Sequence, residues 1–174
     1  ISQFLSTRGY IVIQPQFRGS TGNGNDFADA GYGEWAGKMQ TDTIEALEYE
    51  ISKGDVDKNR VCIVGGSYGG YSALVGAAQD PERFKCAISF GGVFDLAAMQ
   101  LTGENRGDGV SLSVAYWREH MGVTRYDSKK IHSISPVYMV DKIKSPILLM
   151  HGTDDTVVMP EQSQKMYAAL KKAG

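Results

Sequence analysis

The sequence lacks the long apolar run that a membrane-spanning helix needs. It also lacks blocks of like charge: 18 basic and 20 acidic residues leave a formal charge of −2. This balance argues against nucleic acid or an anionic membrane surface as the main partner, so we expect no nucleic acid and no membrane as partners. The 174 residues are enough for one domain and few for two.

Cysteine is scarce as well. The chain has two cysteines, Cys62 and Cys86, and each lies in an apolar, strand-like run. We expect buried, reduced thiols on neighbouring strands, with a disulfide as the alternative. No Cys/His cluster has the spacing of a zinc site, and we expect no metal and no organic cofactor.

We do not expect the first residues of this sequence to be a secretory leader. Residues 1–6 have neither a charged leader nor a cleavage site and are typical of the last turns of a helix. The sequence ends just past another predicted helix. We therefore expect both ends to be cut from a longer protein and residues 1–174 to form part of one catalytic domain.

Short apolar runs alternate with helical patterns along the chain. The runs predict strands over residues 10–13, 61–64, 86–90 and 147–150. The helical patterns predict helices over residues 42–53, 71–79, 111–120 and 160–173, with Asp42 and Glu45 as a capping box for the first. Such alternation predicts an α/β fold, a parallel sheet with helices on both faces.

The strongest local signal is Gly65-Gly66-Ser67-Tyr68-Gly69, a G-x-S-x-G between a predicted strand and a predicted helix. A serine nucleophile on a tight strand-to-helix turn has this pattern, because the turn is strained and leaves little room for side chains. The turn also aims helix N-terminal N–H groups at a developing oxyanion. We therefore assign Ser67 as the nucleophile and the Tyr68 N–H as an oxyanion donor; a plain strand-to-helix turn is the alternative.

A triad on such a fold runs Ser, then Asp or Glu, then His, and the acid follows a later strand. The strand predicted over residues 147–150 leads into Asp154 and Asp155, and the spacing alone does not choose between them. All three histidines, His120, His132 and His151, precede or open this loop. We expect His151 to organise the turn and the catalytic histidine to lie beyond Gly174.

Taken together, these motifs resemble the catalytic domain of the prolyl oligopeptidase family of serine peptidases, in particular its acylaminoacyl-peptidase and dipeptidyl-peptidase branches. The matching segments include Arg18-Gly19-Ser20-Thr21-Gly22, Gly65-Gly66-Ser67-Tyr68-Gly69-Gly70-Tyr71, Ser135-Pro136 and His151-Gly152 to Gln162-Ser163. The resemblance implies an incomplete α/β-hydrolase fold and peptide hydrolysis through a Ser-Asp-His triad.

The resemblance also separates the two aspartates. In the family the acid lies four residues after the His of His-Gly and three before a Val, which Asp155 satisfies through His151 and Val158. Asp154 is the fallback. Two family features are expected outside the chain, the triad histidine and a second oxyanion donor. A third, an Arg or Asn two residues after the acid, is replaced by Val157.

The family also implies a substrate pocket. In the family, an aromatic ring that follows the next strand after the nucleophile turn often stacks on the substrate residue before the scissile bond. Alignment from Phe90 places Leu96 there, with Val93, Val158 and the Tyr68 ring completing the pocket; plain core residues are the alternative. We expect this pocket to prefer Leu, Met, Phe or Ala over Pro.

The sequence thus predicts a serine peptidase that acts on short peptides. A carboxylesterase or lipase on the same fold and a non-catalytic module are the alternatives. We expect residues 1–174 alone to be nearly inactive, because a serine hydroxyl without a base stays protonated. We expect a cytoplasmic protein, with the periplasm or secretion left open, and a homo-oligomer is also left open.

Overall fold

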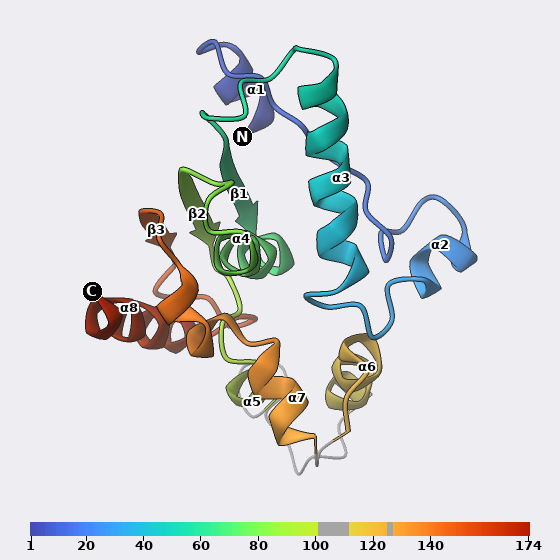
Figure 1. The fold of residues 1–174 in the computed structure, drawn as a ribbon. Coiled ribbons are helices and arrows are strands. Elements are labelled where there is room, and N and C mark those ends of the chain that lie inside the picture. Colours follow the sequence, from blue (N-terminus) through green and yellow to red (C-terminus); the bar gives the residue numbers. More distant parts are fainter. Residues whose placement is uncertain (101–111, 125–126) are drawn as a thin grey trace.

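The computed structural model describes residues 1–100, 112–124 and 127–174. Its centre is a parallel sheet in the order β1 (Cys62–Gly66), β2 (Cys86–Phe90) and β3 (Ile147–Met150). The register pairs Gly66 with Phe90 and Phe90 with Met150. The carboxyl ends of the three strands therefore meet at one edge of the sheet (Figure 1).

Helices connect and flank these strands (Figure 1). They are α1 (Ser2–Ser6), α2 (Asn25–Asp29), α3 (Lys38–Ser52), α4 (Tyr68–Gln79), α5 (Leu96–Met99), α6 (Leu112–Met121), α7 (Ser128–Ser133) and α8 (Glu161–Ala173), with the short 3₁₀ helices η2 (Pro136–Tyr138) and η3 (Val140–Lys142). Among the described residues, no helix has the length and apolar character needed to cross a bilayer.

Helix α4 is the central helix of the core. It follows β1 directly and packs against β1 and β2, and every residue from Gly70 to Ala78 is buried. This explains why its sequence is apolar nearly all round. On the opposite face of the sheet, Val64, Leu148 and Met150 are 37%, 50% and 44% exposed. The described helices α4 and α8 pack against the other face of the sheet.

The strands predicted over residues 86–90 and 147–150 have those bounds in the structure, and the strand predicted over 61–64 lies at Cys62–Gly66. The strand predicted over residues 10–13 is not formed. Tyr10 and Ile11 are each 64% exposed, and no described strand pairs with this segment. A β-branched run favours a strand, but a strand forms only where a neighbour supplies hydrogen bonds.

The predicted capping box at Asp42 and Glu45 is also wrong. Helix α3 begins earlier, at Lys38, and the Glu34 Oε2 atom accepts the Lys38 N–H at 2.9 Å. Asp42 lies inside the helix and accepts two side-chain hydrogen bonds from Arg18, at 2.7 and 2.6 Å. In this way Arg18 fixes the start of the glycine-rich connection over residues 18–37 against α3.

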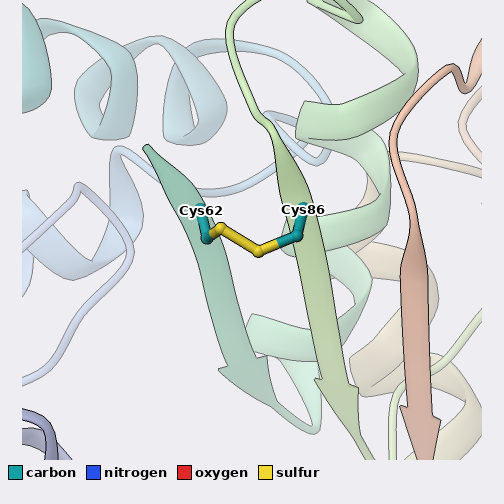
Figure 2. The surroundings of a disulfide bond; sticks show 2 residues. All are labelled: Cys62 and Cys86. Atoms are coloured by element: carbon teal, nitrogen blue, oxygen red, sulfur yellow. A yellow bond between two sulfur atoms is a disulfide. The ribbon is translucent and has the colours of Figure 1, made fainter. Parts of the chain in front are cut away.

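Cys62 and Cys86 form a disulfide rather than two reduced thiols (Figure 2). The two residues are direct register partners on β1 and β2, so their side chains leave the same face of the sheet. Cys62 is exposed and Cys86 is half-buried on that uncovered face. The expectation of neighbouring strands was right, whereas the expected burial and reduced state were wrong.

Replacing both cysteines by alanine is expected to lower the free energy of unfolding by about 3 kcal/mol, because the disulfide closes a loop that restricts the unfolded chain. For a domain of this size, that loss corresponds to a fall of roughly 6–12 °C in the unfolding midpoint. Differential scanning calorimetry measures it. Dithiothreitol should lower the wild-type midpoint equally and leave the double variant unchanged; equal shifts in both proteins would contradict the disulfide's role.

Candidate active site

Ser67 occupies the tight turn between β1 and α4. Its backbone has φ 52° and ψ −119°, a left-handed region that non-glycine residues rarely adopt. The Ser67 N–H donates to the Phe90 carbonyl at 2.9 Å, which ties the turn to the end of β2. Such strain costs on the order of 1–3 kcal/mol and marks functional sites. The turn leaves the Ser67 side chain exposed above the sheet edge.

Close backbone contacts explain two of the glycines around Ser67. A Cβ atom at Gly65 would lie 2.3 Å from the Gly69 carbonyl carbon, and one at Gly70 would lie 2.9 Å from the Gly92 Cα. A Cβ atom at Gly69 would meet nothing within 4 Å. The glycine after the motif, Gly70, is therefore sterically required, whereas the last glycine of the motif is not.

An open pocket of about 610 Å³ lies at the carboxyl ends of β2 and β3. Ser67 and Asp155 both line it, together with His151. Ser67 comes from the β1–α4 turn and Asp155 from the loop after β3, because parallel strands bring these two connections to one edge. The structure thus brings the predicted nucleophile and the preferred acid to one pocket.

The Asp155 carboxylate is held by its own loop. Its Oδ1 atom accepts the backbone N–H groups of Val157 and Val158, at 3.0 and 2.9 Å. Its Oδ2 atom lies 3.4 Å from the His151 Nε2 atom and faces Gly91, where an added Cβ would lie 3.3 Å away. One oxygen is therefore used for positioning, and the other remains able to accept a further hydrogen bond. Asp154 is exposed and is not among the described residues that line the pocket.

His151 holds the same loop from inside. Its Nε2 atom lies 2.7 Å from the Val158 carbonyl, and its Nδ1 atom lies 2.7 Å from the Ser163 hydroxyl. A carbonyl oxygen only accepts, so Nε2 carries the hydrogen, and Nδ1 of a neutral ring accepts from Ser163. Both ring nitrogens are thus occupied, as expected for a histidine that organises the turn.

The other two histidines, His120 and His132, are not among the described residues that line this pocket. The His120 Nδ1 atom is 2.8 Å from the Tyr116 carbonyl, and its ring contacts the Tyr116 ring. His132 is exposed and packs against Tyr138. All three histidines of the chain lie in the described ranges, and none of them forms a hydrogen bond with Ser67 there.

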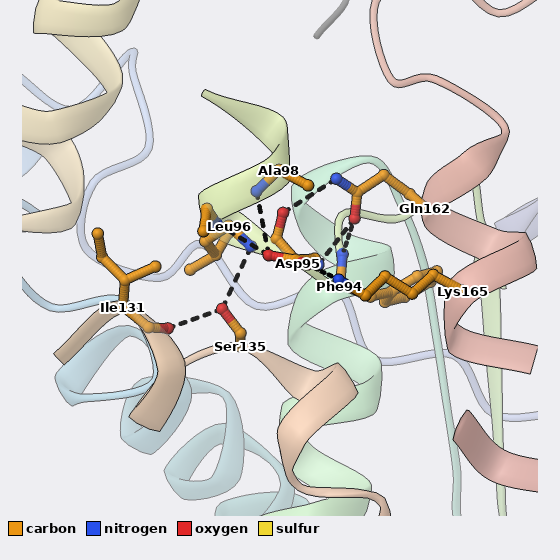
Figure 3. Close-up of polar contacts among 9 residues, drawn as sticks. Phe94, Asp95, Leu96, Ala98, Ile131, Ser135, Gln162 and Lys165 are labelled. Atoms are coloured by element: carbon orange, nitrogen blue, oxygen red, sulfur yellow. Dashed lines mark hydrogen bonds and ion pairs between the residues drawn. The ribbon is translucent and has the colours of Figure 1, made fainter. Parts of the chain in front are cut away.

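Polar contacts from α8 fix the connection that follows β2 (Figure 3). The Gln162 Oε1 atom accepts the N–H groups of Phe94 and Asp95 at 2.9 and 2.7 Å, and its Nε2 atom donates to the Asp95 carbonyl at 3.0 Å. Lys165 pairs with the Asp95 carboxylate. Burial alone would raise the pKa of Asp95, but Lys165 and the helix N–H groups outweigh it and hold that pKa below its ordinary value.

A second, smaller pocket of about 40 Å³ adjoins Ser67. Three of the four residues predicted for a substrate pocket line it: Tyr68, Val93 and Val158. The other described lining residues are Trp35, Ser67, Met99, Trp117 and Val157. Leu96 is wrongly predicted for this wall: it is 0% exposed and belongs to the core, where its N–H donates to the Ser135 hydroxyl.

The sequence patterns missed Trp35, Met99 and Trp117 as pocket residues. Trp35 lies in a glycine-rich loop with no periodic pattern, and Trp117 comes from α6, far away in the sequence. Only packing in three dimensions brings them to Ser67, so no local signal could have found them.

Chemically, this arrangement suits nucleophilic attack by a serine. The Tyr68 N–H is the first of α4 and has no acceptor within the helix, so it can bind an oxyanion beside Ser67. Burial raises the pKa of the Tyr68 phenol well above its ordinary value, which keeps that side chain neutral. In the described part of the chain, no three His, Cys, Asp or Glu side chains are close enough to hold a metal ion.

Known proteins are similar to this chain in sequence and in fold. Residues 1–174 match the model of a peptidase family described as the prolyl oligopeptidase family. Dipeptidyl aminopeptidase BIII of Pseudoxanthomonas mexicana is 36% identical over 179 residues, which cover 98% of this chain and 24% of that protein. Dipeptidyl peptidase family member 6 of Caenorhabditis elegans is 33% identical, with 99% and 23% covered. The chain thus spans about a quarter of the length of these curated relatives.

Solved structures agree on the fold. A puromycin-hydrolyzing peptidase of Mycobacterium tuberculosis superposes with a TM-score of 0.82 at 28% identity, over 90% of this chain and 23% of that one. An acylaminoacyl peptidase of Pyrococcus horikoshii superposes with a TM-score of 0.80 at 24% identity, over 91% and 25%. The parallel α/β arrangement described above is therefore that of the hydrolase domain in these peptidases.

The glycine contacts predict a difference between two neighbouring alanine variants. Gly70→Ala is expected to lower the free energy of unfolding by about 1–3 kcal/mol, because its Cβ collides with the end of β2. Gly69→Ala is the matched control: it should cost nothing and can gain up to about 1 kcal/mol of helix propensity. Urea unfolding of the two variants measures the difference, and equal losses would show that the steric reading is wrong.

Proposed function

The chain belongs to the prolyl oligopeptidase family, and from that premise we propose that the intact protein is a serine peptidase that hydrolyses short peptides through an acyl-enzyme on Ser67. The observation that carries the proposal is that Ser67, on its strained turn, and the Asp155 carboxylate line the same pocket. A plain strand-to-helix turn would need neither this strained backbone nor a hydrogen-bonded carboxylate in the same pocket.

The proposed reaction has two acyl-transfer steps. The Ser67 oxygen attacks the carbonyl carbon of the scissile bond while its proton passes to a histidine. That histidine then protonates the leaving amine as the carbon–nitrogen bond breaks. A water molecule, deprotonated by the same histidine, hydrolyses the ester and regenerates Ser67. The Tyr68 N–H stabilises the oxyanion of each tetrahedral intermediate.

We propose that this histidine lies outside residues 1–174. His151 is the histidine of the chain that lines the Ser67 pocket, and its two ring nitrogens are occupied by the Val158 carbonyl and the Ser163 hydroxyl. Asp155 has the geometry of an orienting acid: its Oδ1 atom is fixed by two backbone N–H groups, while its Oδ2 atom can accept the N–H of an incoming imidazole. The carboxylate would hold the tautomer and stabilise the imidazolium.

The names of the relatives support a peptide substrate over a simple ester. They refer to the release of dipeptides and of acylated amino acids, as in dipeptidyl aminopeptidase BIII and the acylamino-acid-releasing enzyme of Arabidopsis thaliana. The amide bond of a short peptide is the chemistry these names share. A protein that hydrolyses esters and no peptides would instead fit the carboxylesterase alternative.

Among the compartments that the sequence leaves open, the disulfide favours the periplasm or secretion over the cytoplasm. Disulfides persist in oxidising environments, whereas cytosolic thiols are kept reduced. Because Cys62 is exposed, this bond would be accessible to a reducing cytosol.

Ser67 is expected to react covalently with a fluorophosphonate probe in the intact protein, since an activated serine attacks the phosphorus as it attacks a carbonyl. Mass spectrometry of the labelled peptide locates the adduct. The Ser67→Ala variant should remain unlabelled and inactive on peptides. Labelling that persists in this variant would place the nucleophile elsewhere.

The two aspartates are expected to differ sharply. Asp155→Asn should lower kcat by about 10⁴-fold, because the base loses its correct tautomer. Asp154→Asn, at an exposed position outside the pocket, should change kcat little. Steady-state kinetics with a chromogenic peptide measure both variants after titration of active sites. A larger loss in Asp154→Asn would assign the acid to the other residue.

A further inference from the structure

Gln162 is a buried amide at the start of α8 that binds a distant part of the chain. It is 5% exposed and is the second residue of the helix. Its Oε1 atom accepts the N–H groups of Phe94 and Asp95, at 2.9 and 2.7 Å, and its Nε2 atom donates to the Asp95 carbonyl at 3.0 Å (Figure 3). Because these three hydrogen bonds are directional, they fix both the distance and the orientation of α8 relative to the connection that follows β2.

The Asp155 loop runs directly into this end of α8. The Asp155 Oδ1 atom accepts the N–H groups of Val157 and Val158, and the helix begins soon after Val158. The Gln162 N–H donates to the Met159 carbonyl at 3.0 Å, so the first turn of the helix is tied back to the loop. These hydrogen bonds leave the segment little freedom to bend. The Asp155 carboxylate therefore moves together with the first turn of α8.

The connection after β2 borders the Ser67 turn at its other end. The Ser67 N–H donates to the Phe90 carbonyl at 2.9 Å. Gly92 packs so closely on α4 that a Cβ atom at Gly70 would lie 2.9 Å from the Gly92 Cα. Gln162 binds this connection just beyond Gly92. A short series of contacts thus joins the Ser67 turn to α8, in addition to the contacts made through the sheet.

Both halves of the Gln162 amide are used, so side chains of similar size cannot replace it. Glutamate would keep the two acceptor contacts but would lose the hydrogen bond to the Asp95 carbonyl. Methionine would lose all three hydrogen bonds and leave two buried N–H groups without a partner, which costs more than the hydrogen bonds alone. The backbone after β2 would then shift to find new partners, and α8 would shift relative to it.

We propose that Gln162 is a positioning residue for the hydrolysis and that it sets the distance between the Ser67 turn and the Asp155 carboxylate. The inference rests on the proposed function and adds to it a residue that is not among those described as lining either pocket beside Ser67. Gln162 acts through Asp155, because it holds the end of the loop that carries this acid. A displacement of about 1 Å in a catalytic group can lower the rate about 10²-fold.

The test uses Gln162→Met and Gln162→Glu in the intact protein, each with and without Asp155→Asn. The rate constant for fluorophosphonate labelling of Ser67 is measured for every variant, and kcat and KM on a chromogenic peptide are expressed per labelled site. We expect Gln162→Met to lower the labelling rate and kcat by about 10- to 100-fold while KM changes by less than about 2-fold. Gln162→Glu should lie between this variant and the wild type.

The Asp155→Asn background separates a positioning role from a general one. If Gln162 acts through Asp155, the two effects are not additive. In this background Gln162→Met should therefore lower the labelling rate by less than about 3-fold, because the acid that it positions is already lost.

Gln40→Met is the matched control. Gln40 is also 5% exposed, and its Oε1 atom accepts the Ser72 hydroxyl at 2.7 Å, a contact between α3 and α4 that does not involve the Asp155 loop. The substitution is the same and removes a buried hydrogen bond, so it shows how a loss of stability alone affects the rate. We expect its labelling rate and its kcat per labelled site to equal those of the wild type.

Any of four results would overturn the inference: unchanged rates in both Gln162 variants, a loss confined to KM, equal losses with and without Asp155→Asn, or an equal loss in Gln40→Met. If Gln162→Met does not fold, Gln162→Glu decides by the same criteria. A wild type that is labelled and cleaves peptides, beside unaffected Gln162 variants, contradicts the positioning role alone. Wild-type protein that is neither labelled nor active contradicts the proposed function, and the inference falls with it.

Discussion

The approach of the β1 backbone to the first turn of α4 constrains everything else in the described site. Gly65 lies so close to Gly69 that a single added carbon would fall 2.3 Å from its carbonyl carbon. The chain can make this contact only by turning sharply at Ser67, in a left-handed conformation. Gly70 then packs against the end of β2, and the Ser67 N–H reaches the Phe90 carbonyl. The position of the serine is thus set by backbone contacts, which leave it little freedom.

Side chains, rather than backbone packing, place the acid opposite this turn. His151 fastens the loop after β3 to the start of α8, and Gln162 fastens α8 to the connection after β2. His151 contacts the Ser163 hydroxyl of α8, and Gln162 binds backbone atoms of Phe94 and Asp95, so the loops from two strands are held as one unit. The Asp155 carboxylate sits inside that unit with one oxygen fixed. The site is therefore organised before any substrate binds, which is the condition for electrostatic stabilisation of a transition state.

Local patterns predicted the parts of this site that depend on local geometry. Ser67 and its turn follow from glycine spacing between a strand and a helix, and two strands have the bounds that their apolar runs predict. Residue preferences could not decide the segment 10–13, because a strand needs a hydrogen-bonding partner as well as β-branched residues.

Long-range contacts account for the other differences. Asp42 fits a capping box by its spacing, but Arg18 recruits it into an ion pair from the preceding loop. Leu96 aligns with the position that lines the substrate pocket in the family. In this structure Trp35 and Trp117, from distant segments, line the small pocket beside Ser67 instead. In both cases the contact that forms is with a residue far away in the sequence, which a local sequence pattern does not include.

The left-handed backbone at Ser67 also limits how this domain can evolve. A residue with φ 52° tolerates a side chain with one heavy substituent on Cβ far better than a β-branched one. Cysteine would fit the turn as serine does, so a thiol nucleophile is within reach of a single exchange. Threonine carries a second substituent on Cβ and would strain the turn beyond what serine imposes. The turn can therefore accept a change from serine to cysteine at position 67. A change to threonine, which is the nucleophile in some other hydrolases, is disfavoured by the same backbone conformation.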